Sequence, residues 1–342
     1  MAISNDLLSS TLFSILKKEV DQLYQTTPFL DFAKEMNGIE YEDGGIKIQR
    51  PLSLEEHSTI TQFATGYEGL NLAVKDPMRP AIYDWVDFAA PIVITKKEST
   101  ENRGEKGIVK ILGARTRSVT GMLRREINKQ IIRGNSSVLT QLNTLNGAVG
   151  GFLEVENANG VNQTNVIGGI SKATYNQTTG WQNQFVDILG FFGTNGIRLM
   201  KAARNRANKR APISEVNLLL MSEDAGANYE RALFAQERFI KESELNGGRK
   251  VRMFGNAVFE EELELGFTAT SVDSGGGAKP VSGYGINFGG IRTVFHEEGE
   301  FAAAPFETIS GTMAQVSTIY LKMQVVADHL GSQFVLFDGD GY

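Results

Sequence analysis

Hydrophobic and polar positions follow a helical period in several stretches of the chain. Apolar residues recur every three or four positions over residues 5–24, from Leu8 to Leu23, which is typical of an amphipathic helix. The same spacing over residues 103–133 predicts the longest helix, about 45 Å from end to end. Further helices are expected at four places: residues 29–36, 137–145, 181–210 (weakened by Gly190, Gly193 and Gly196) and 222–234.

Strand patterns dominate the last third of the chain. Val216 to Met221 is an apolar, β-branched run that predicts a buried strand. Later strands are expected at Lys250–Phe259, Tyr284–Phe288, Ile291–His296, Val316–Val326 and Gln333–Phe337, and Gly275–Gly277 is expected to be a flexible turn.

Residues 43–96 predict an extended hairpin. Ile46 and Ile48 alternate with polar residues, and strand character returns from Ala81 onwards. The stretch between them, Ser53 to Pro80, is polar and has little apolar content to bury. Ordering such an excursion costs conformational entropy, so we expect contacts outside the subunit's own core to stabilise it.

Composition excludes several kinds of chemistry. The 342 residues include no cysteine, which rules out disulfides, thiolate metal sites and cysteine nucleophiles. The three histidines are isolated, and no nucleophile elbow, Walker loop or zinc-protease motif occurs. The acidic clusters at residues 260–264 and 297–300 are interpreted as solvated faces or intersubunit salt-bridge surfaces. We therefore expect no enzymatic activity, no cofactor and no metal.

The start of the chain has no basic segment followed by an unbroken apolar run, and no stretch of 18 apolar residues occurs. We therefore expect neither a secretory signal nor a transmembrane helix, and synthesis in a cytoplasm.

Positive charge is concentrated in two helical segments although the net charge is −6. Residues 96–133 hold eleven basic and four acidic residues, and residues 198–210 hold six basic residues and no acidic one. The plainer interpretation is a solvated helix face, and the alternative is a local positive potential that attracts an anionic partner.

Three motifs, in chain order, carry a resemblance to a known family. Ile167–Tyr175 leading to Trp181–Gln184 is similar to a "GGI…W" segment, and Asn217–Arg231 is similar to a central strand and helix that end in Tyr-Glu-Arg. Tyr284–Phe288, followed by the long strand at 316–326, completes the series. Together with the order of helices and strands, these motifs resemble the major capsid proteins of tailed bacteriophages, which have the Hong Kong 97-like fold.

The resemblance implies an α+β fold with an N-terminal arm, an extended loop, a peripheral domain with a long spine helix, and an axial domain. The implied ranges are 1–36 for the arm, 37–96 for the extended loop and its flanking strands, 97–139 with 311–342 for the peripheral domain, and 140–310 for the axial domain. The sheet beside the spine is expected to use residues near 82–95 and 316–336.

The implied function is structural. Copies of the chain would assemble as hexamers and pentamers into an icosahedral or prolate shell around a double-stranded DNA genome, in the host bacterial cytoplasm, and would end in the virion. Implied partners are the chain itself, a portal protein, a decoration protein and packaged DNA. Because the first helix begins by residue 5, the resemblance implies either a separate scaffolding protein or none. No membrane partner is implied.

If the spine helix faces the shell interior, its basic residues are candidates for contacting DNA without reading sequence. They are Arg115, Arg117, Arg124, Arg125, Lys129 and Arg133. The second basic segment could instead face an interface. Some members of the family carry a lysine–asparagine cross-link, but Lys47 and Lys75 in the extended loop are interpreted as solvated lysines.

Two other functions remain open at this point. An encapsulin-type compartment would have the same fold and a protein cargo. A soluble enzyme is disfavoured, because nucleophile, base and metal ligands are absent as a set.

Overall fold

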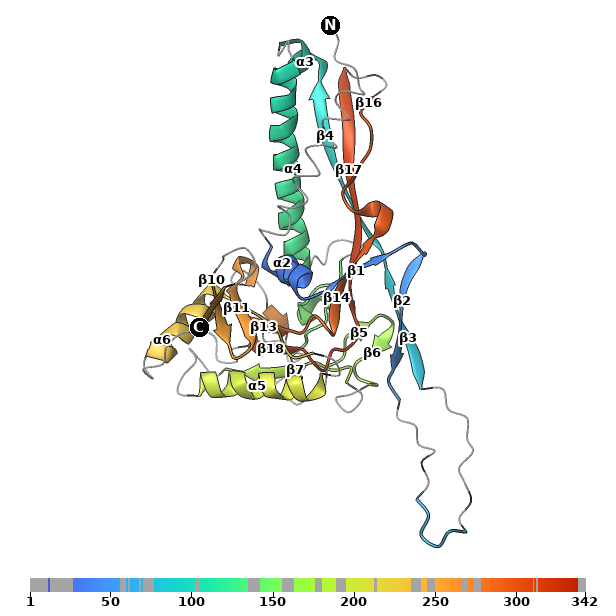
Figure 1. Ribbon diagram of the computed structural model, residues 1–342, viewed down its shortest axis with the longest axis vertical. Coiled ribbons are helices and arrows are strands. Elements are labelled where there is room, and N and C mark those ends of the chain that lie inside the picture. Colours follow the sequence, from blue (N-terminus) through green and yellow to red (C-terminus); the bar gives the residue numbers. More distant parts are fainter. Residues whose placement is uncertain are drawn as a thin grey trace.

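The computed structural model contains two main sheets, a long helix beside the first sheet and a hairpin that extends beyond both (Figure 1). It describes residues 27–55, 62–67, 77–101, 105–134, 142–155, 163–175, 180–188, 195–211, 214–234, 241–244, 250–265, 270–272, 278–309 and 313–337, together with residues 12, 60, 69 and 311. Most of the helix predicted over 5–24 and the turn predicted at 275–277 lie outside this part of the chain.

The first sheet is built on the long strand β17, which pairs with β4 over ten residues and continues past it to pair with β14. Alternate residues of β4 are buried, as in a strand with one face on a core. The six strands are β1 (Ile39–Glu42), β4 (Val86–Thr95), β14 (Ile291–His296), β15 (Ala302–Ala303), β16 (Glu307–Thr308) and β17 (Ala314–Ala327).

Helix α4 (Glu105–Arg133) lies along this sheet, as the apolar spacing predicted (Figure 1). Its buried stripe includes Leu112, Leu123, Ile127 and Ile131, which join the main hydrophobic core. Two short helices accompany it: α2 (Pro28–Glu35) lies at the lower end of α4 in Figure 1, and α3 (Lys96–Glu101) directly follows β4.

The second sheet has β8 (Leu218–Met221) at its centre, and all four residues of that strand are buried. Leu218 and Leu220 join the main core, whereas Leu219 and Met221 join a second core on the opposite face. Its other strands are β7 (Gln184–Asp187), β9 (Lys241–Glu244), β10 (Lys250–Phe254), β11 (Ala257–Glu261), β12 (Thr270–Val272), β13 (Ala278–Ile286) and β18 (Phe334–Phe337).

Helices α5 (Gly196–Arg210) and α6 (Glu223–Phe234) cover the second core. Met200, Ala203 and Ala207 of α5, and Ala225 and Tyr229 of α6, are buried against this face. The small alanine side chains allow α5 to approach β7 closely, which places the basic side of the helix outward.

Two small hairpins lie outside these sheets. Strands β2 (Lys47–Ser53) and β3 (Met78–Asp84) form the predicted extended hairpin, and β5 (Val166–Ile167) and β6 (Ile170–Ser171) flank the Gly168-Gly169 turn. Three single-turn 3-10 helices complete the fold: η1 (Gly147–Val149), η2 (Leu263–Leu265) and η3 (Glu297–Gly299).

Two helix predictions were wrong in part. The helix expected over 181–210 begins only at Gly196, because Gln184–Asp187 forms a strand that pairs in parallel with β18. Pairing with a neighbouring strand outweighed a helical pattern that three glycines already weakened. Of the helix expected over 137–145, residues 142–145 are not helical, and 135–141 lie outside the described residues.

Two strand predictions also differ from the structure. Lys250–Phe259 is two antiparallel strands, because Gly255 adopts a positive φ of 66° and turns the chain. Phe334–Phe337 was expected beside the spine helix but pairs with β13 and β7 in the second sheet. Its four residues are buried, which fits an interior position in that sheet.

Candidate assembly surfaces

The β2–β3 hairpin presents apolar side chains to solvent on its outer part. The root of the hairpin is buried, with Ile48 and Ala81 both 0% exposed. Beyond the root the exposure rises, and Tyr67 is 96% exposed. Among the described residues of the hairpin and its root, the exposed large apolar residues are Ile46, Ile60, Phe63, Tyr67, Met78 and Ile82. Exposed apolar patches are typical of surfaces that contact proteins, membranes or ligands, so this projection is a candidate assembly surface.

Charged side chains fix the root of the hairpin to the first sheet. Arg50 of β2 forms ion pairs with Glu40 and, at 3.4 Å, with Glu42. Arg292 of β14 pairs with the same Glu40 and, at 3.3 Å, with Asp328. These partly buried pairs link β1, β2 and β14, so the direction of the hairpin is set by the sheet.

The Gly168-Gly169 turn supports the hairpin from the other side. The backbone N–H of Ile82 donates to the carbonyl of Gly168 at 2.9 Å, and the hydroxyl of Tyr83 donates to the carbonyl of Ala327 at 2.9 Å. A Cβ at Gly168 would lie 2.9 Å from the Cβ of Ala81, so only glycine fits this approach without a shift. Burial raises the pKa of the Tyr83 hydroxyl well above its usual value.

Directly after this turn lies a buried lysine that the sequence did not single out. The ammonium of Lys172 is 0% exposed and donates to the carbonyl of Phe152 at 2.5 Å and to Oδ1 of Asn183 at 3.0 Å. Its carboxylate partner is Glu154 at 3.5 Å. Burial lowers the pKa of Lys172 to about 8, and Glu154 opposes that shift. Trp181, from the resembling motif, donates from its indole N–H to Ile170 at 3.3 Å.

This network explains why the glycine-rich segment is ordered without a regular sheet. Asn183 also donates to the carbonyl of Glu154 at 2.8 Å, and Gln163 donates to the carbonyl of Asn183 at 2.9 Å. Side chains therefore satisfy backbone groups that strands would otherwise pair. The motif that carries the resemblance is a structural core, and none of these residues lies in the exposed part of the hairpin.

The six basic residues predicted on the spine helix divide into two groups. Arg117, Arg125 and Lys129 are exposed and share one stripe of α4 with Met122, which is 68% exposed. The other three are engaged within the subunit: Arg124 is buried, Arg115 pairs with Glu98, and Arg133 pairs with Glu264 at 2.9 Å.

The C-terminal part of α4 contacts an acid from a cluster that was expected to be a solvated face or an intersubunit salt-bridge surface. Glu262 is 3% exposed and accepts a hydrogen bond from the side-chain amide of Asn128 at 2.9 Å. Desolvation raises the pKa of Glu262, and the bond from Asn128 partly opposes that shift. In the same cluster Glu261 pairs with Arg252 at 2.8 Å, so these acids make contacts within the subunit.

The structure adds two observations on other kinds of site. Among the described residues, no three His, Asp or Glu side chains are grouped so that they could hold a metal ion. In the same part of the chain, no helix combines the length and apolarity needed to cross a membrane.

Comparison with known proteins assigns the fold. No family model and no curated protein matches the sequence. Among solved structures, the cyanophage A-1(L) capsid aligns with a TM-score of 0.59 at 12% identity, covering 91% of this chain and 92% of that chain. The capsid of an empty GTA particle aligns with a TM-score of 0.55 at 10% identity, covering 90% and 89%. The SrpI encapsulin of Synechococcus elongatus PCC 7942 aligns with a TM-score of 0.49 at 11% identity, covering 76% and 75%.

The chain thus has the fold of phage capsid subunits. In this Hong Kong 97-like, α+β fold, the hairpin, the long helix and the two sheets occur in the order that the sequence predicted.

Proposed function

We propose that the protein is the major capsid protein of a tailed bacteriophage, with a structural rather than a catalytic role. The observation that carries the proposal is the β2–β3 hairpin, whose described residues expose six large apolar side chains, with Ile60, Phe63 and Tyr67 in its outer part, while its root is fixed by ion pairs. A rigidly directed apolar projection is suited to binding a neighbouring copy. Capsid subunits of the same fold support this interpretation.

We propose that each of the two sheets forms the centre of one domain. The first sheet with α4 would form the peripheral domain, and the second sheet with α5 and α6 would form the axial domain around which five or six copies meet. Because β14 lies in the first sheet and β18 in the second, we place residues 291–296 in the peripheral domain and 334–337 in the axial domain. Portal, scaffolding and decoration proteins stay predictions from the resemblance.

Velocity sedimentation of the full chain tests the proposal of a shell. A shell subunit buries obligate interfaces, so we expect most of the protein in species of very high mass at moderate concentration. Replacing Ile60, Phe63 and Tyr67 by serine should shift the protein to single subunits or capsomers without loss of helix content. An unchanged sedimentation profile in this triple variant would contradict the role of the hairpin.

We further propose that the exposed stripe of α4 faces packaged DNA and contacts its phosphates. Arg117, Arg125 and Lys129 supply the positive charge, whereas Arg115, Arg124 and Arg133 are engaged within the subunit. Binding of this kind releases counterions and is independent of base sequence.

Fluorescence anisotropy with duplex DNA over a range of salt tests the stripe. Changing Arg117, Arg125 and Lys129 to glutamine should flatten the slope of log affinity against log salt by about 2 to 3, or about 0.9 per phosphate contact. The matched control changes three exposed cations elsewhere on the subunit, Arg198 and Lys201 of α5 and Lys34 of α2. Equal slopes for the two triple variants would contradict the DNA-facing role of α4. A shell that has no affinity for DNA would favour the alternative function, a compartment for protein cargo.

A further inference from the structure

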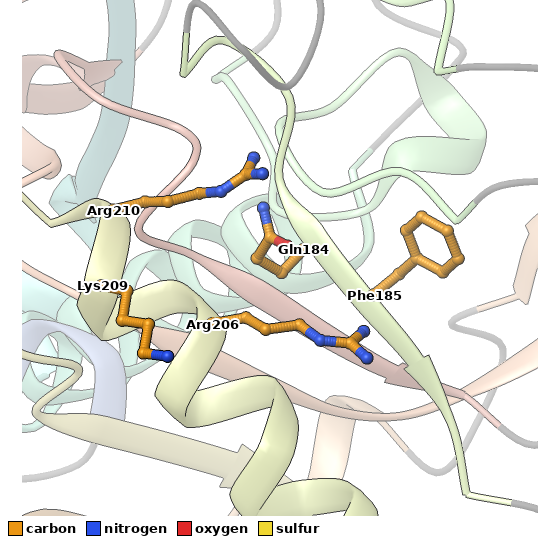
Figure 2. A pocket seen from close by; sticks show the side chains of 5 residues that line it. All are labelled: Gln184, Phe185, Arg206, Lys209 and Arg210. Carbon is orange, nitrogen blue, oxygen red and sulfur yellow. The ribbon is translucent and has the colours of Figure 1, made fainter.

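A hollow of about 430 Å³ lies between α5 and β7, on the second sheet. Gln184 and Phe185 line it from the strand, and Arg206, Lys209 and Arg210 line it from the helix. Figure 2 shows the guanidinium groups of Arg206 and Arg210 extending from the helix on two sides of Gln184. Three cations from the last turns of one helix therefore line the same hollow as a strand amide.

The described part of the chain does not neutralise two of these cations. Arg206 and Lys209 are exposed, and no described carboxylate lies within 4 Å of either side chain. Arg204, one turn earlier on the same helix, does have an acidic partner, Glu215 at 3.3 Å. Two of the cations that line the hollow thus have no acidic partner among the described residues, unlike Arg204.

Gln184 provides a second, independent observation. The residue is only 5% exposed, and its side-chain Nε2 donates no hydrogen bond to any residue in the described part of the chain. A buried amide donor without an acceptor costs free energy, and such groups normally find a protein or solvent partner. An acceptor entering the hollow would satisfy this donor.

We propose that the hollow binds a phosphate group. Lysine, arginine and the amide Nε2 are all hydrogen-bond donors, so the ligand must supply several acceptor oxygens and negative charge. A guanidinium fork matches two oxygens of a phosphate, and a lysine ammonium adds a further donor and positive charge. The volume lies in the range of small-ligand pockets, so the phosphate can belong to a free anion or to a nucleic-acid backbone. The proposal requires no shell, because all five lining residues belong to one chain.

Isothermal titration calorimetry of the full chain with inorganic phosphate, and separately with a short DNA duplex, tests the proposal. The variant R206Q/K209Q removes two cations of the hollow and should weaken phosphate binding about tenfold or more. The variant R198Q/K201Q removes two exposed cations of the same helix outside the hollow and should change binding less than about twofold.

A third variant distinguishes a specific phosphate site from nonspecific attraction by positive charge. Q184M keeps the size of the side chain and the charge of the protein but removes the buried donor. It should weaken phosphate binding about fivefold, with unchanged circular dichroism.

Each outcome decides between these interpretations. Phosphate binding that both R206Q/K209Q and Q184M weaken supports the site with a free anion as ligand. Binding of the duplex alone, with the same dependence on the variants, supports it with a nucleic-acid backbone as the source. Absence of binding to both probes, or equal losses in the two double variants, overturns the proposal. Loss of assembly in R206Q/K209Q without phosphate or duplex binding also overturns it and points to an acidic segment of a neighbouring copy.

Discussion

Lys172 shows how one buried charge orders a segment that has little regular structure. Four acceptors surround its ammonium, from Phe152, Asn183, Gln163 and Glu154. A fully buried cation is tolerated only when it is paired and hydrogen-bonded. A lone lysine after a glycine turn gives no sign of this in sequence, because its partners lie nine to twenty residues away.

Replacing Lys172 by methionine should lower the free energy of unfolding by about 3 kcal/mol, because Glu154 loses its cationic partner in a largely buried place. Chemical denaturation followed by the fluorescence of the buried Trp181 measures the loss. The control, Lys201→Met on exposed α5, should change it by less than about 0.5 kcal/mol. Equal stabilities of the two variants would contradict the structural role of the network.

The same lysine predicts a pH dependence with a defined sign. In the folded chain its pKa is lowered to about 8, from 10.5 when it is solvated. Between these values the unfolded chain binds more protons, so the contribution of Lys172 to the free energy of unfolding rises with pH. The stability of the native chain relative to Lys172→Met should therefore increase between about pH 8 and 10. A constant difference over this window would contradict the lowered pKa.

At the scale of elements, sequence periodicity predicted the helices and strands that bury one face and expose the other. Helix α4 and the strand β17 have alternating or striped burial, and both were predicted within two residues of their observed ends. The segment 181–210 mixes a strand with a helix, and only the parallel neighbour β18 decides its first half. The contact between the Gly168 turn and the hairpin could not be predicted from the sequence either, because it joins residues far apart in the chain.

Two neighbouring glycines test that contact. Gly168 and Gly169 both have positive φ, 57° and 81°, so alanine is strained at either position. A Cβ at Gly169 meets nothing within 4 Å, whereas one at Gly168 meets the hairpin. Gly168→Ala should therefore destabilise the protein by about 1 to 3 kcal/mol more than Gly169→Ala, as measured by thermal or chemical unfolding. Equal effects would show that the turn does not support the hairpin.

At the scale of the whole molecule, the subunit has two cores and one projection. The described residues of the projection's outer part are mostly exposed, and the cores bury residues of both sheets. The sequence predicted the projection from a lack of apolar residues to bury, and its exposed apolar side chains support the same conclusion. Which basic residues face outward could not be predicted, because Arg124 and Arg125 are neighbours in sequence but differ in burial.

Shortening the hairpin separates folding from assembly. The backbone N–H of Leu54 donates to the carbonyl of Pro77 at 3.2 Å, so residues 55–76 can be replaced by Asn-Gly, a two-residue turn. The variant should keep its thermal unfolding transition, since both cores lie outside this segment, but should form no closed shells. Normal shells in electron micrographs of this variant would contradict the assembly role of the outer hairpin.

Electron cryo-microscopy of the full chain, purified as the fraction of highest mass, tests the proposed function most directly. The account predicts closed shells built from rings of five and six subunits, with the outer hairpin of each subunit lying on a neighbour. Single subunits at every concentration and salt, also in the presence of a co-expressed scaffolding candidate, would contradict it.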